Sequence, residues 1–179
     1  FLDGVAGLSS GKQDFYACQG GLRALTFHPD GSVDVEPLDP GRLPAFTLRL
    51  SDGKSRDAHE LLRAQDDDRV LVLLKYLARV MIGCVRADDM GSVGAVLRES
   101  WRAKRTLAGV STPGLDSAIA AGIEAGALAG KLCGAGTSGH LVFIVPPSSR
   151  AAVISALPDW GEPSCASSSL EEPVSLGAR

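Results

Sequence analysis

This sequence has few aromatic residues. It also lacks closely spaced cysteines, long apolar runs and an excess of basic residues. Aromatic side chains make up 5% of its 179 residues, and 18 Lys+Arg against 21 Asp+Glu give a formal net charge of −3. Because phosphate neutralisation requires a basic surface, we expect no nucleic-acid partner. No apolar run approaches the roughly 20 residues of a membrane span, so we expect no membrane partner either.

The cysteines and histidines are widely spaced along the chain. The four cysteines are Cys18, Cys84, Cys133 and Cys165. No pair has the C-x-x-C spacing that zinc and redox sites commonly use. We therefore expect reduced thiols, no metal site and a cytoplasmic location. The 21 glycines are abundant but not periodic, which favours loops that depend on backbone freedom.

The front of the chain predicts β structure over residues 21–51. An apolar run ending at Phe27, a turn around Gly31 and a period-2 run through Val33 and Val35 indicate a hairpin. Alternation over residues 46–50 predicts another strand, and Ser51-Asp52-Gly53 predicts a turn after it.

From about Ser55, a candidate N-cap, the apolar spacing changes to that of helices. We expect a long helix through Met81, with a possible break at residues 66–68, and a second helix capped by Asp88 or Asp89. A third should begin at Thr112-Pro113 and end at Gly126 or Gly130.

Near the end of the chain, the run over residues 141–145 predicts a strand buried on both faces. We expect Ser148 to cap a short helix that ends at Pro158. Residues 161–179 carry little apolar surface and predict a disordered tail.

Two segments could carry chemistry. In the first, Asp14 follows Lys12 and Gln13, and a carboxylate beside a cation can accept the proton of a hydroxyl. The alternative is a capped turn with solvated polar groups. In the second, the glycines of residues 134–139 could bring backbone N–H groups to an anion. The alternative is a tight connection without a ligand.

Two basic features are weaker. Arg56 at a predicted helix start could bind phosphate or carboxylate, or be solvated beside a capping Ser55. The basic cluster at residues 102–105 could meet a phosphorylated ligand, or form the solvated face of a helix whose Trp101 is core.

Five stretches of the sequence, taken in their order along the chain, resemble the later part of a GHMP-type small-molecule kinase. The resemblance is strongest to the heptose 7-phosphate kinase branch, and fucokinase-type enzymes come next. The resemblance runs over residues 9–157. The matching stretches are GKQDFYACQGGL (11–22), FHPDGSVDVEPL (27–38), SDGKSRDA (51–58), WRAKRTLAGVSTPGLD (101–116) and AGALAGKLCGAGTSGHLVF (125–143).

The resemblance implies an α+β fold with a partial, β-rich N-terminal domain over residues 1–56. A C-terminal domain over residues 57–160, with helices packed on an antiparallel sheet, would follow, and then the tail. It also implies ATP- and Mg²⁺-dependent phosphorylation of a sugar or sugar phosphate at its anomeric hydroxyl. The partners would be a small-molecule sugar phosphate and a nucleotide.

The resemblance also assigns roles to the residues of this sequence that match the functional positions of the family. The resemblance implies that Asp14 is the catalytic carboxylate. Substrate contacts would come from Lys12, Gln13 and Arg56. Nucleotide contacts would come from the Gly-rich loop, at Gly134, Ala135, Gly136 and Gly139.

The chain departs from the family pattern in several places. Phe15 stands where Gln is usual, Thr137 and Ser138 replace two loop glycines, and His140 replaces an apolar residue. If the glycine positions need positive φ or a close backbone approach, the substitutions at residues 137 and 138 strain the loop or displace the ligand. The family's glycine-serine phosphate loop has no counterpart here, and the chain starts at Phe1. We therefore expect part of a longer protein.

Three readings follow, and whether these residues alone are an enzyme stays open. The first is a sugar kinase, the second a non-catalytic remnant that binds a sugar phosphate or a partner chain, and the third a purely structural domain. The sequence leaves the oligomeric state open, although apolar surface exposed by a missing half would favour association.

Overall fold

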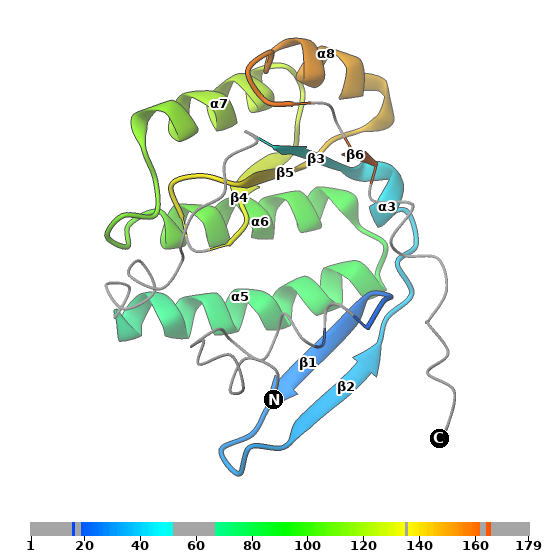
Figure 1. Cartoon of the computed structure of the whole chain (residues 1–179). Helices are drawn as coiled ribbons and strands as arrows, with labels where there is room; N and C mark the ends of the chain where they lie inside the picture. Colours follow the sequence, from blue (N-terminus) through cyan, green and yellow to red (C-terminus); the bar gives the residue numbers. More distant parts are fainter. Residues whose placement is uncertain (1–15, 17–18, 52–66, 135, 162–163, 166–179) are drawn as a thin grey trace, which may run out of the picture.

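The computed structural model describes residues 16, 19–51, 67–134, 136–161 and 164–165. These residues form a mixed α+β structure (Figure 1). The elements, in chain order, are β1 (Arg23–Phe27), β2 (Val33–Pro37), α3 (Leu43–Phe46), β3 (Thr47–Ser51), α5 (Asp68–Arg86), α6 (Met90–Lys104), α7 (Pro113–Glu124), β4 (Ala129–Leu132), β5 (His140–Ile144), the 3₁₀ turn η1 (Pro147–Ser149), α8 (Arg150–Ser155) and β6 (Ser164–Cys165).

A four-stranded antiparallel sheet of order β4-β5-β3-β6 organises the fold. Figure 1 shows α7 and α8 on one side of this sheet, and α6 followed by α5 on the other. The predicted α+β class with helices on an antiparallel sheet is confirmed. No helix in the described part of the chain is both long and apolar enough to cross a bilayer.

The predicted hairpin is confirmed as a separate two-stranded sheet. Strands β1 and β2 pair antiparallel, with Phe27 opposite Val33. The turn is closed by Asp30, whose carboxylate accepts hydrogen bonds from the N–H and hydroxyl of Ser32. These bonds lower the pKa of Asp30, the side-chain one most. Gly31 has a φ of +87°, which glycine adopts without steric cost.

The helices begin where capping side chains are available. Asp67 accepts hydrogen bonds from the first turn of α5, Asp89 does so for α6, and Thr112 does so for α7. Of the two predicted caps for α6, Asp89 is therefore the actual one, and Pro113 opens α7 as predicted. The predicted cap at Ser55 lies outside the described residues.

Apolar side chains fill both sides of the sheet. On the face towards α7 and α8, Leu48, Leu50, Leu141 and Phe143 are at most 1% exposed. A second cluster joins Ile144 to side chains of α5 and α6. The hydrophobic core therefore lies on the two faces of the sheet and not in the loops at the strand ends.

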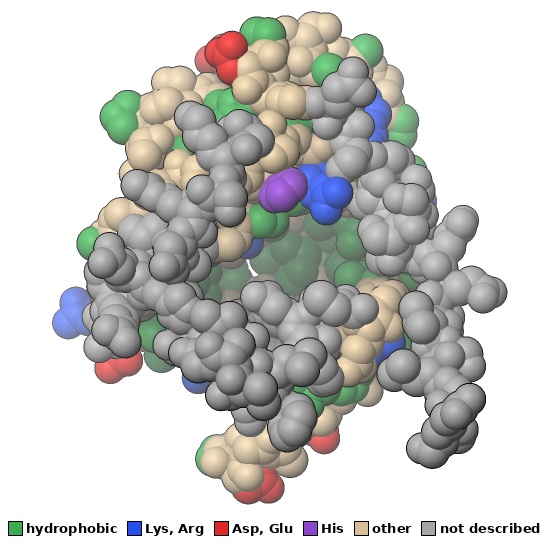
Figure 2. All heavy atoms as spheres, in the orientation of Figure 1, with side chains coloured by type: hydrophobic (Ala, Val, Ile, Leu, Met, Phe, Trp, Pro, Cys, Tyr) green, Lys and Arg blue, Asp and Glu red, His purple; other side chains and the backbone are tan. Residues whose placement is uncertain are grey.

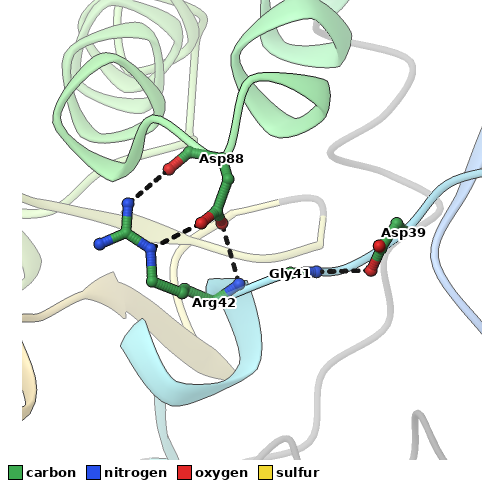
Figure 3. Close-up of polar contacts among 4 residues, drawn as sticks. All are labelled: Asp39, Gly41, Arg42 and Asp88. Carbon is green, nitrogen blue, oxygen red and sulfur yellow. Dashed lines mark hydrogen bonds and ion pairs between the residues drawn. The ribbon is translucent and has the colours of Figure 1, made fainter.

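An arginine clamp joins the segment before α3 to the α5–α6 turn (Figure 3). The backbone N–H of Arg42 donates to Asp88 Oδ1 at 2.9 Å, and its Nε donates to Asp88 Oδ2 at 2.6 Å. A second guanidinium nitrogen donates to the carbonyl of Asp88. A Cβ at Gly41 would lie 2.6 Å from Asp88 Oδ1, so the close approach requires glycine there.

Several predictions of local structure are wrong. Strand β4 and helix α3 were not predicted, because Gly130 and Pro44 read as breakers rather than parts of elements. Ser148 does not cap α8; its N-cap is Ser149, which makes no side-chain capping bond. The strand predicted to be buried on both faces leaves Val142 only partly buried.

The chain after residue 160 also differs from the sequence prediction where it is described. Ser164 and Cys165 pair with β3 as an edge strand, through backbone groups that need no apolar side chains. Strand β3 itself pairs with β5, so residues 47–51 share a sheet with the C-terminal elements. The predicted division between residues 1–56 and 57–160 remains a prediction.

Candidate functional site

Three of the eight predicted site residues lie in the described part of the chain. Gly134, Gly136 and Gly139 form part of the loop between β4 and β5, here called the Gly-rich loop (residues 133–139). The other five lie outside the described residues: Lys12, Gln13, Asp14, Arg56 and Ala135. Their assignments remain predictions.

The backbone of the Gly-rich loop explains its glycines. The φ angles are +81° at Gly134, +142° at Gly136 and +123° at Gly139, all in a region that side chains rarely adopt. Thr137 also has a positive φ, of +62°. The N–H of Ser138 donates to the carbonyl of Gly136 across Thr137, which describes a strained γ-turn.

The strain expected where residues replace family glycines is therefore confirmed at one of the two positions. Thr137 has the left-handed backbone, whereas Ser138 is not among the residues with positive φ. A non-glycine residue in this region costs about 1–2 kcal/mol.

The connection between α6 and α7 holds the Gly-rich loop in place. The N–H of Thr137 donates to the carbonyl of Val110 at 2.9 Å. A Cβ at Gly136 would lie 2.7 Å from Val110 Cα, so the two backbones approach too closely for any side chain. In Figure 1 the yellow β4–β5 loop lies beside this connection.

Lys104, the last residue of α6, is a further anchor of the loop. Its Nζ donates to the carbonyl of Gly134 at 2.6 Å. Burial lowers the pKa of Lys104, and the positive charge of Lys131 on β4 lowers it further; a smaller opposite effect comes from Cys133. Lys104 therefore contacts the first glycine of the Gly-rich loop, and Lys131 lies in the strand that leads into the loop.

The other basic residues at the end of α6 are solvated or form ion pairs. Trp101 is a core residue, as the interpretation of this cluster as a solvated helix face predicted. Trp101 is 4% exposed. Arg102 pairs with Glu99, and Arg105 with Asp116 at 3.4 Å. Of the cluster over residues 102–105, Lys104 alone is among the described contacts to the Gly-rich loop.

The segment that precedes the hairpin can be followed only from Tyr16. Its ring packs edge-on against Phe27, with ring centroids 6.2 Å apart. This contact places the ring of Tyr16 against β1.

The Gly-rich loop suits an anionic group. Among the described residues, no atom lies within 4 Å of the place where a Cβ would stand at Gly134, so the described structure leaves the backbone open on that side. Open backbone beside two lysines suits a phosphoryl group. Within the described ranges, no three His, Cys, Asp or Glu side chains gather in a way that could hold a metal ion.

Figure 2 shows a hollow on this side of the molecule, with hydrophobic side chains inside and a histidine beside a basic side chain at its upper edge. A separate apolar depression lies on α5, lined by residues including Leu71, Val72 and Lys75. None of the described predicted site residues lines that depression.

Sequence reasoning did not assign Lys131 to a site, and it placed Lys104 in a basic cluster that could either meet a phosphorylated ligand or be solvated. The available signal was the position of Lys131, three residues before the first glycine of the loop. The contact of Lys104 could not be read from the sequence, because 30 residues separate it from Gly134.

Known proteins are similar to this chain in sequence and in fold. Residues 81–163 match the family model of the GHMP kinases C terminal domain. The D-glycero-alpha-D-manno-heptose 7-phosphate kinase of Campylobacter jejuni is 28% identical over 165 residues, which is 84% of this chain and 49% of the relative.

Solved structures show the same fold at lower identity. The mevalonate kinase of L. major, in complex with R-mevalonate, superposes with a TM-score of 0.66 at 18% identity, over 81% of this chain and 48% of its own. A D-glycero-D-manno-heptose 1-phosphate kinase from Bacteroides thetaiotaomicron gives 0.62 at 24% identity, over 88% and 45%. The chain thus spans about half the length of these relatives. The chain therefore has a GHMP-kinase-like α+β fold, and its residues 81–163 are similar to the C-terminal domain of GHMP kinases.

Proposed function

We propose that this chain is part of an ATP-dependent kinase that phosphorylates a sugar or sugar phosphate at its anomeric hydroxyl. The observation that carries the proposal is the Gly-rich loop: a backbone held open at Gly134, fixed by Val110, and flanked by Lys104 and Lys131. Phosphoryl transfer depends on positioning and charge stabilisation, which such a loop supplies. The similarity to a heptose 7-phosphate kinase supports a sugar phosphate as the acceptor.

In this proposal Asp14 accepts, or orients, the proton of the anomeric hydroxyl as that oxygen attacks the γ-phosphorus of ATP. Lys12, Gln13 and Arg56 contact the sugar substrate. Residues 1–56 supply the catalytic segment, and residues 57–160 supply the Gly-rich loop. Mg²⁺ accompanies the nucleotide in the assay.

The test is the conversion of D-glycero-D-manno-heptose 7-phosphate, with fucose as a second acceptor, in the presence of ATP and Mg²⁺. Phosphorus NMR would detect a sugar 1-phosphate. We expect Asp14→Asn to lower turnover by roughly 10²–10⁴-fold, because general-base catalysis contributes about that much. Asp159→Asn, at an exposed carboxylate, is the matched control. Turnover by Asp14→Asn equal to that of the unaltered protein would remove the catalytic assignment.

The second candidate is a non-catalytic module that binds a sugar phosphate or a partner chain. The strained backbone of Thr137, at a position where the family has glycine, favours it. Calorimetry with ATP and Mg²⁺ separates the two candidates. Tight nucleotide binding would count against the non-catalytic module, whereas sugar-phosphate binding without nucleotide binding would support it.

A further inference from the structure

Lys104 and Lys131 approach the start of the Gly-rich loop from two elements that are distant in sequence. Lys104 ends α6, and Lys131 lies in β4, opposite Val142 of β5. Both side chains are partly buried, and the pKa of Lys104 is lowered by its burial and, to a lesser extent, by the charge of Lys131. Like charges held together at reduced solvation destabilise the folded state unless something offsets them.

The carboxylates of Asp116 on α7 and Glu99 on α6 pair with arginines and not with these lysines. Asp116 pairs with Arg105 and also accepts a hydrogen bond from Ser111 at 2.8 Å. Glu99 pairs with Arg102. Within the described ranges, no ion pair joins either lysine to a carboxylate. The groups whose charges affect the pKa of Lys104 are Lys131 and the thiol of Cys133.

The donors and the space for a ligand are both present. An ammonium group has three N–H donors, and the contact with the Gly134 carbonyl uses one donor of Lys104. The two loop glycines differ here: Gly136 packs against Val110, whereas the side of Gly134 where a Cβ would stand is open. The position of Gly136 is thus explained by packing, and Gly134 remains available to a ligand.

We propose that Lys104 and Lys131, with the open backbone of Gly134 beside them, bind a phosphoryl group. This inference deepens the proposed function, and it rests on that function only for the source of the phosphoryl group, which is either the nucleotide or a sugar phosphate. Lys104 has a second role, because its bond to Gly134 ties the position of the loop to the end of α6.

The first experiment measures the binding of inorganic phosphate by calorimetry, without turnover. We expect Lys131→Met to weaken phosphate binding by tenfold or more and Lys131→Arg to retain most of it. Lys75→Met is the matched control, because Lys75 is an exposed lysine on α5. Lys104→Met should weaken binding as well, but it also removes the bond to Gly134, so Lys131→Met is the cleaner variant. Equal phosphate binding by Lys131→Met and Lys75→Met would overturn the proposal.

The second experiment follows the ammonium of Lys104 by NMR on ¹³C-lysine-labelled protein. Phosphate should raise the pKa of Lys104, because a bound anion stabilises the charged form. Lys131→Met should also raise it in the absence of phosphate, because the repulsion is gone. A pKa of Lys104 that does not respond to saturating phosphate would overturn the proposal.

The source of the phosphoryl group is resolved by repeating the binding measurement with ATP–Mg²⁺ and with heptose 7-phosphate. Weaker binding of ATP alone to Lys131→Met assigns the pair to the nucleotide, and weaker binding of heptose 7-phosphate alone assigns it to the sugar phosphate. If Lys131→Met binds both as the unaltered protein does, the proposal fails. If phosphate binding depends on Lys131 while the protein shows no kinase turnover, the proposed function fails and the site stands.

Discussion

Individual residues of the Gly-rich loop determine how closely two backbones can approach. Gly136 allows the loop to contact Val110, and Gly134 leaves its own backbone open. Thr137 adopts the same left-handed backbone with a β-branched side chain, which is unfavourable. Strained backbone of this kind persists where the surrounding structure enforces it, and here the hydrogen bond to Val110 does so.

At this scale we predict that Thr137→Gly stabilises the protein, by up to about 1 kcal/mol, because it relieves the left-handed strain. Urea unfolding measures the change. Ser138→Gly is the control, because Ser138 lacks a positive φ and its replacement adds only backbone freedom, which destabilises. A Thr137→Gly protein less stable than Ser138→Gly would show that the Thr137 side chain contributes more than its strain costs.

A second residue-scale prediction concerns the clamp between Arg42 and Asp88. The hydrogen bond from the Arg42 backbone, followed by that from its side chain, lowers the pKa of Asp88. A carboxyl whose folded-state pKa is lowered stabilises the protein above its unfolded pKa, about 3.9, and this contribution disappears as pH falls through the folded-state value.

We therefore expect Asp88→Asn to lower the melting temperature at neutral pH, and the difference from the unaltered protein to shrink as the solution is acidified below pH of about 4. Asparagine tolerates the φ of +51° at this position, so the backbone is not the cause. Thermal unfolding over a pH series measures the effect. A difference that is the same at acidic and neutral pH would contradict the assignment.

At the scale of elements, α7 packs closely on the sheet because two glycines flank one aromatic ring. A Cβ at Gly122 of α7 or at Gly130 of β4 would lie 2.4 Å from Cε1 of Phe143. Phe143 is 0% exposed, so its ring has no free space to move into. Sequence reasoning took Gly130 as a possible helix end, whereas its role is to let β4 lie beneath this ring.

We predict that Gly122→Ala destabilises the protein by about 1–3 kcal/mol, the usual effect of overpacking. Gly83→Ala is the matched control in α5, because nothing lies within 4 Å of its Cβ position. It should stabilise by about 0.4–1 kcal/mol, since alanine reduces the freedom of the unfolded chain. Both values come from denaturant unfolding, and a stabilising Gly122→Ala would show that the ring can shift.

At the scale of the whole molecule, α5 exposes several large apolar side chains to solvent. The exposed fractions are 67% for Val72 and 63% for Tyr76, with Leu71 and Leu73 near 40%. Exposed apolar surface on one helix favours association between molecules. The net charge of −3 supplies little repulsion against it.

We predict concentration-dependent self-association, reduced by Val72→Lys. Sedimentation velocity measures the mass distribution. Val35→Lys on β2 is the control, because Val35 is also an exposed apolar residue but lies away from α5. Identical sedimentation of the unaltered protein and Val72→Lys, both as monomers, would refute the prediction.

The sequence by itself determined the elements whose signals are local. The hairpin around Gly31, the cap at Thr112 and the helical apolar spacing over α5 and α6 all follow from neighbouring residues, because turns, caps and amphipathic faces are set within a few positions. The glycine positions of the loop were also readable, since positive φ is a property of one residue.

Only the tertiary structure decided which distant segments meet. Strand β3 joins β5 across about half the chain, Lys104 reaches Gly134, and Val110 receives the N–H of Thr137. No local pattern encodes these contacts, because they depend on how the helices and strands pack together. For this reason the sequence offered an anion-binding loop as one alternative and a basic cluster at residues 102–105 as a separate feature, whereas the contact of Lys104 with the loop emerged only from the fold.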